Sequence, residues 1–191
     1  PRAAYYIEHQ QMDEFKKLSK KALNFVFLVA SPMMIYFMLF AKQGIYFLSG
    51  DAFGPAVVPM QLIMPTLLLI GITNILGIQI LVPLGYEKAV LVSEIVGAVI
   101  DLVVNALLIP VYQSSGAAIG TLLAEFAVMV VQCIALKNEI KTAFSDIKYL
   151  KIILAIILAS LASYWVVALN LHVFITLVIS AILFFGVYGL V

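Results

Sequence analysis

Charged residues are scarce in this chain: only 11% of its 191 residues are Asp, Glu, Lys or Arg, against roughly 25% in soluble proteins. Hydrophobic residues make up 64%, and the mean hydropathy is +1.15. A water-soluble fold cannot bury so large an apolar fraction, because even a large domain keeps much of its surface in water. The composition therefore excludes a soluble domain. The net charge of +1 also gives no reason to expect nucleic acid as a partner.

Residues that form disulfides and metal centres are nearly absent. A single cysteine, Cys133, excludes an intramolecular disulfide, and it has no Cys or His neighbour at metal-ligand spacing. The two histidines, His9 and His172, stand in separate polar stretches. The sequence contains no glycine-rich phosphate loop and no nucleophile elbow. We therefore expect no enzyme activity, no metal and no cofactor, and we interpret Cys133 as a packing side chain.

Long apolar runs dominate the rest of the chain. A membrane span needs about 20 apolar residues to cross roughly 30 Å of hydrocarbon. Six runs meet this length, at about 22–41, 57–83, 89–109, 116–136, 152–169 and 173–191. They predict an all-α, polytopic membrane protein with a cytoplasmic arm at 1–21 and a six-helix lobe at 22–191. Because the connections are short, we expect consecutive helices to be antiparallel neighbours in a compact bundle.

The basic residues fall almost entirely on one side of these six runs. Ten of the eleven Lys and Arg residues lie in the N-terminal arm or in the even-numbered connections, and only Lys42 lies on the other side. Positive charge is retained in the cytoplasm during insertion, so both ends of the chain are expected inside the cell. The arm has helical apolar spacing at Met12 and Phe15, which predicts an amphipathic helix that orients insertion. The chain begins at Pro1 with no cleavable signal, and we expect it to be a fragment of a longer protein.

The second run contains several helix-breaking residues. Pro65 stands in its middle and predicts a kink, because proline cannot donate a helical hydrogen bond. Such a break can be a hinge in a transporter or a static packing adjustment. We take Pro65 as the candidate hinge and leave the static alternative open.

Small residues recur every four positions in the fourth run. Gly116, Gly120 and Ala124 would lie on one face of a helix, which is typical of close packing between membrane helices. This face could also slide during a conformational change, but packing alone explains it.

Acidic residues inside the apolar runs are the candidate functional groups. Glu94 and Asp101 stand seven residues apart, so they are separated by only about 20° around a helix, and Asn105 continues their stripe. Glu125 in the next run reaches a similar depth if the chain reverses direction. A carboxylate in the bilayer is costly, so these side chains are expected to face the protein interior. Without basic partners they favour binding of a proton or another cation; a purely structural role is the alternative.

Several short motifs lie between residues 74 and 126. They are Gly77-Ile78-Gln79-Ile80-Leu81, Pro83-Leu84-Gly85, Asn105 with Ile109-Pro110, Gly116-Ala117-Ala118, and Ala124-Glu125. Together they resemble the bacterial polysaccharide-biosynthesis and O-antigen flippases of the multidrug, oligosaccharidyl-lipid and polysaccharide exporter superfamily. The opening Pro1-Arg2 fits the same pattern. The resemblance covers about residues 1–136, and the last two runs fit by hydropathy and order only.

The resemblance implies the C-terminal lobe of a MATE-like transporter in the bacterial cytoplasmic membrane. Its cargo would be an undecaprenyl-diphosphate-linked oligosaccharide for O-antigen, capsule or exopolysaccharide assembly. Its partners would be the missing N-terminal lobe, membrane lipids and the polysaccharide polymerase machinery. Two alternatives remain open: a cation-coupled multidrug exporter of the same fold, and a membrane scaffold that transports nothing.

Overall fold

The computed structural model describes residues 2–137 and 149–191, and within these ranges it contains helices and turns but no strand. The predicted connection at 137–151 lies mostly outside the described residues, including Lys141 and Lys148. The elements in chain order are α1 (Arg2–Glu8), α2 (Met12–Leu39), α3 (Ala41–Ser49), η1 (Asp51–Ala56), α4 (Val57–Ile63), α5 (Thr66–Asn74), η2 (Ile75–Leu81), α6 (Glu87–Tyr112), α7 (Ser114–Leu136), α9 (Tyr149–Tyr164), η3 (Trp165–Leu169) and α10 (Val173–Leu190).

Six helical units in the described part of the chain are long and apolar enough to cross a membrane. They are Met12–Leu39, Asp51–Leu81, Glu87–Tyr112, Ser114–Leu136, Tyr149–Leu169 and Val173–Leu190. Each contains most of one predicted run. The prediction of an all-α, polytopic membrane protein is therefore confirmed.

The first unit begins earlier than the sequence suggested. Helix α2 runs without interruption from Met12 to Leu39, so residues 12–21 continue the first span instead of forming a separate arm helix. The separate piece is the short helix α1, which ends near Gln10, a residue with a positive φ of 57°. Lys17 donates a hydrogen bond to Glu14 at 2.7 Å on the exposed surface of α2. The charged start of the span is thus a helical extension of the span itself.

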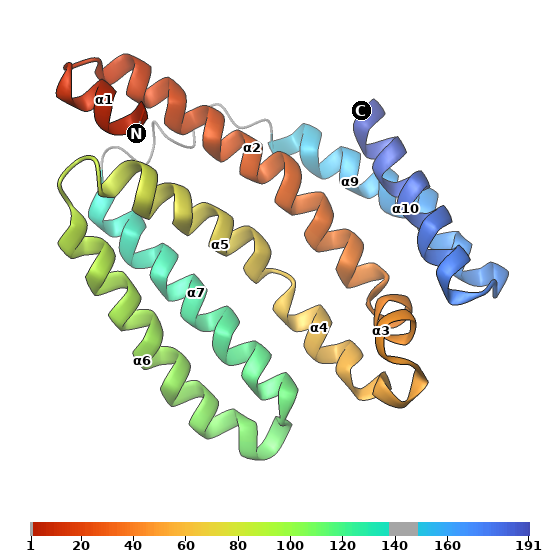
Figure 1. Ribbon diagram of the computed structural model, residues 1–191. Helices are drawn as coiled ribbons and strands as arrows, with labels where there is room; N and C mark the ends of the chain where they lie inside the picture. The colour runs from red at the N-terminus through yellow and green to blue at the C-terminus, as the bar shows by residue number, and fades with distance from the viewer. Residues whose placement is uncertain (1, 138–148) are drawn as a thin grey trace.

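The spans lie side by side in an open row (Figure 1). Helix α6 packs on α7, α7 packs on α4 and α5, these pack on α2, and α2 packs on α9, which pairs with α10. The expectation that consecutive spans are neighbours holds for α2 with α4 and α5, for α6 with α7, and for α9 with α10. It holds only weakly between the second and third spans, because α4 and α5 pack on α7 and the second span meets α6 through η2, and it fails for α9, which packs on α2 instead of α7. The row also replaces the expected compact bundle, and it leaves many apolar side chains of α6 exposed.

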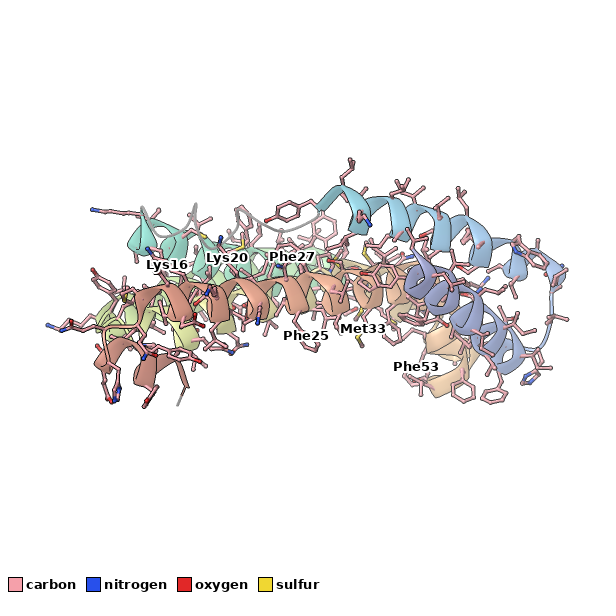
Figure 2. All side chains as sticks on the ribbon, turned by 90° about the horizontal axis from the view of Figure 1, so that it is seen from above. Lys16, Lys20, Phe25, Phe27, Met33 and Phe53 are labelled. Atoms are coloured by element: carbon pink, nitrogen blue, oxygen red, sulfur yellow. The ribbon has the colours of Figure 1, made fainter. Side chains whose placement is uncertain are left out.

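Two hydrophobic clusters connect the row. In the first, Leu23 of α2 is fully buried with Leu76 and Leu81 of η2, and Leu136 of α7 joins them. In the second, Tyr36 of α2 packs with Phe40, Ala159 and Phe184, and the Tyr36 hydroxyl donates to the Leu177 carbonyl at 3.0 Å. Helix α2 therefore contributes to both hydrophobic clusters. Figure 2 shows it running along the molecule, with Phe25 and Phe27 pointing to opposite sides.

The two ends of the spanning helices differ in the number of basic residues that they carry. The start of α6, which carries Lys88, and the end of α7 lie near α1, at the end where α2 begins (Figure 1). Helix α3, which carries Lys42, lies at the opposite end with the α6–α7 turn. Among the described residues, the basic beginnings of α2 and α6 therefore lie at one end of the structure, together with the end of α7.

Candidate functional site

Helices α6 and α7 form a tight antiparallel hairpin. Every fourth residue along one face of α6 lies opposite every fourth residue along one face of α7. Ser93 lies opposite Gln132, whose Nε2 donates a hydrogen bond to the Ser93 hydroxyl oxygen at 3.3 Å. Gly97 lies against Val128, and Asn105 lies against Gly120. The two facing stripes are therefore 93, 97, 101, 105 on α6 and 120, 124, 128, 132 on α7. Asp101 and Ala124 take the central place in this register and line one hollow.

Glycine makes this hairpin possible. A Cβ atom added at Gly116 would lie 2.5 Å from the Leu108 carbonyl oxygen, and one added at Gly97 would lie 2.5 Å from Val128 Cγ2. At Gly120 the added atom would overlap the Asn105 side chain. Real Cβ contacts are not this short, so the backbones approach more closely than side chains at these positions allow. Gly116, Gly120 and Ala124 are all buried in the structure, and α6 lies against both glycines.

The structure brings the three predicted acids together. Glu94, Asp101 and Glu125 line one hollow of about 240 Å³ between α6 and α7, with Thr121 and Ala98. Glu94 is exposed, whereas Asp101 and Glu125 are partly buried. Glu125 thus reaches the depth between the other two that the chain reversal predicts. The acidic stripe lies along the edge of the hairpin and not in the centre of a bundle.

A second hollow of about 200 Å³ continues from the first toward the second span. Glu94 and Glu125 line this hollow too, and its other polar side chains are Thr73, Asn74 and Gln132. The two hollows share both glutamates, so together they form one polar groove across α5, α6 and α7. We call it the acidic groove.

The backbone beside the acidic groove departs from the α-helix twice. The second span breaks at Met64 and Pro65, visible as a bend between α4 and α5 (Figure 1), where the Thr66 hydroxyl donates to the Ile63 carbonyl at 2.6 Å. After α5 the chain widens into the π-helical segment η2, in which the Val82 N–H donates to the Gly77 carbonyl at 3.0 Å. The kink predicted at Pro65 is present. Single π-helical turns frequently mark functional sites, and Gly77 lines the acidic groove.

Polar atoms along the hairpin are left without partners. Within the described part of the chain, Asp101 Oδ1, Asn105 Oδ1 and Gln132 Oε1 are buried and accept no hydrogen bond. An unsatisfied buried polar atom costs about 1–3 kcal/mol. Asp101 lines the first hollow and Gln132 the second, so each hollow has a side chain with an acceptor atom that no described residue satisfies.

Positive charge is missing from the acidic groove. None of its three carboxylates forms an ion pair with a described residue, and the described residues contain no cluster of metal-ligating side chains. A diphosphate would find no cation here among residues 2–137 and 149–191. The groove can bind protons or cations, or donor groups of a neutral ligand.

Sequence reasoning missed Ser93 and Gln132. Their side chains are 0% and 1% exposed, and they anchor the end of the hairpin nearest η2. The signal was present, because Gln132 continues the four-residue spacing of Gly120, Ala124 and Val128. Cys133, by contrast, packs against the first hydrophobic cluster, which confirms its interpretation as packing.

The acidic groove, the kink at Pro65 and the glycine-packed hairpin are the features of the described residues on which we base a functional proposal. Comparisons with models of known protein families, with curated proteins and with solved structures find no match.

Proposed function

We propose that this chain is the C-terminal lobe of a flippase that moves undecaprenyl-diphosphate-linked oligosaccharides across the bacterial cytoplasmic membrane. The glycan would enter O-antigen, capsule or exopolysaccharide assembly. The lobe would work with an N-terminal lobe of the same protein and deliver its product to the polysaccharide polymerase machinery. Both ends of the chain would be cytoplasmic, because the lysine-bearing connections share one end of the row.

The acidic groove carries this proposal. Acids within a spanning segment rarely face lipid, because the bilayer penalises each by a few kcal/mol. The groove lies on spans that form an open row, so its exposed acid Glu94 would need a covering surface inside the membrane. A second lobe facing α5, α6 and α7 would provide it and would enclose a polar cavity between the lobes. Alternating access in transporters uses such a cavity near the middle of the membrane.

A cation-coupled multidrug exporter of the same architecture is the second candidate. The observation that favours it is the absence of cationic side chains beside Glu94, Asp101 and Glu125 in the described residues. A cationic drug or a coupling ion would compensate this charge, whereas a diphosphate would not. In the flippase, the cations that hold the diphosphate would come from the other lobe or from lysines at the membrane surface.

Deleting the gene and assaying lipid-linked repeat units on each membrane face tests the proposal. A flippase predicts accumulation on the cytoplasmic face, with rescue by the full-length protein. An unchanged distribution would reject it. Drug tolerance measured in the same strains identifies the exporter, because loss of tolerance with normal glycan distribution would favour that candidate.

A non-transporting scaffold requires a separate assay. Cysteine placed at Asp101 or Asn105 in full-length protein reports whether the acidic groove changes its accessibility to a thiol reagent. A transporter predicts a change in labelling when cargo is supplied. Constant labelling at both positions, with labelling at an exposed control such as Gln113, would indicate a scaffold.

A further inference from the structure

A third hollow, away from the acidic groove, lies between α2, α9 and α10. Its volume is about 460 Å³, and the residues around it come from the first half of α2, the start of α9 and the end of α10. In Figure 1 these segments meet near the C-terminal end of the chain. We call this hollow the α2–α9–α10 crevice. The transport proposal makes no use of it.

One part of the crevice is basic and polar. Lys21 and Asn24 of α2 and Lys151 of α9 line it, and no Asp or Glu of the described residues does so. Neither lysine forms an ion pair within the described part of the chain. Lys21 is within electrostatic range of Glu14, but the hydrogen bond of that carboxylate comes from Lys17. Two lysines from different helices therefore line one crevice, and no carboxylate of the described residues lines it with them.

The remaining walls are apolar. Phe25 and Leu28 extend the crevice along α2, and Ile152 and Ala155 extend it along α9. Lys21 and Leu28 are seven residues apart, which is about 10 Å along a helix. Tyr188 of α10 forms part of the wall and donates its hydroxyl to the Leu28 carbonyl at 2.8 Å. This bond joins α10 to α2 directly beside the crevice.

We propose that the α2–α9–α10 crevice binds one anionic phospholipid. The phosphate lies between Lys21 and Lys151, with the Asn24 amide as a further donor, and an acyl chain lies against Phe25 and Leu28. A basic end that opens into apolar walls matches a lipid with a charged head and a hydrocarbon tail. Basic residues at a membrane surface attract anionic lipids by about 1 kcal/mol each, whereas a zwitterionic head has no net charge to attract.

The bound lipid would hold the α9–α10 pair against α2. Within the described residues, these parts meet at the second hydrophobic cluster, at hydrogen bonds of Tyr188 and Tyr36, and through the packing of α9 and α10 on α2. Lys21 and Lys151 lie on the two sides of that junction. A phosphate between them replaces their mutual repulsion with two attractions. The lipid therefore stabilises the junction and has a structural role.

Native mass spectrometry of the full-length protein in detergent tests this proposal. Phosphatidylglycerol and phosphatidylcholine with identical acyl chains are added separately, and bound lipid is counted. The expected result is preferential binding of phosphatidylglycerol. K21Q and K151Q should each weaken that preference about fivefold, the equivalent of about 1 kcal/mol per lysine, and K21R with K151R should retain it. K88Q removes an exposed lysine outside the crevice and should change nothing.

Phe25→Ala distinguishes binding of the acyl chain from binding of the charged headgroup. It should weaken both lipids equally and leave the preference intact, because Phe25 contributes apolar wall and no charge. Equal binding of the two lipids by the unmodified protein would overturn the proposal, as would a K88Q effect as large as that of K21Q. Binding of a polyprenyl phosphate without binding of phosphatidylglycerol would also overturn it and would assign the crevice to the cargo lipid.

Discussion

The side chain of Asn105 lies so close to Gly120 that a Cβ atom at position 120 would overlap its Oδ1. Asn105 Oδ1 is buried and accepts no hydrogen bond from the described residues. The contact is therefore steric and not polar, and it sets the distance between α6 and α7 beside Asp101. Helices in lipid associate largely through such close packing, because the bilayer provides no hydrophobic drive.

Gly120→Leu should lower the abundance of the folded protein in the membrane. The added side chain must displace Asn105 or separate the hairpin, and overpacking of this kind costs about 1–3 kcal/mol or more. Thermal unfolding in detergent, followed by size-exclusion chromatography, measures the loss. Gly186→Leu is the matched control, because a Cβ atom at Gly186 meets nothing within 4 Å. A fully abundant but inactive G120L protein would instead show that this face moves during transport.

The sequence was sufficient to locate the spans, because hydropathy and length alone decide which segments can cross a bilayer. Their order in the row could not be predicted. Short connections keep consecutive helices close to each other. Helix α7, however, packs on two helices: its glycine and alanine stripe holds α6, and α5 packs on another face of α7. The open face of the row was equally hidden, since the sequence of the six spans does not show which helix faces remain without a neighbouring helix.

The contact between Ser93 and Gln132 should be measurable as a coupling energy. Ser93→Ala and Gln132→Leu each remove one partner of the 3.3 Å hydrogen bond. Hydrogen bonds between membrane helices contribute on average about 0.6 kcal/mol. The loss of unfolding free energy in the double variant should therefore be smaller, by about that amount, than the sum of the losses in the two single variants. Unfolding of all four proteins in detergent gives the value. Strict additivity would mean that the two side chains are neighbours without an energetic interaction.

Pro65→Ala should straighten the second span. Alanine restores an N–H that can bond to the Gln61 carbonyl, and proline inside a helix costs about 3 kcal/mol, so stability should rise or stay unchanged. If the bend is a hinge, transport should fall while abundance is kept. Pro59→Ala is the control, because Pro59 lies within α4, before the break. Normal transport by P65A would assign the bend to static packing.

The candidate site was predicted only in part. Asp101 and Glu94 are separated by two helical turns, so periodicity placed them on one stripe, and the reversal after α6 brought Glu125 between them. The π-helical segment η2 has no sequence signature, and Gly77 of η2 lines the same groove as Asn74 at the end of α5. Whether an acid is buried depends on the neighbouring helix, and Glu94 is exposed where the stripe alone predicted an interior position.

Asp101→Asn is the decisive substitution for the acidic groove. The amide has nearly the same shape as the carboxyl group, so the hairpin should fold and membrane abundance should stay near normal. Asp101 lies in the hollow with Glu94 and Glu125, and its Oδ1 lacks a partner in the described residues. A proton or cation that joins this site during the cycle should lose its binding, and transport should fall about tenfold, the size of a coupling free energy near 1.4 kcal/mol. Asp51→Asn, an exposed acid in η1 at the start of the second span, should leave transport unchanged. Vesicle assays at several pH values complete the experiment: equal rates for D101N and the unmodified protein at every pH would show that Asp101 takes no part in coupling.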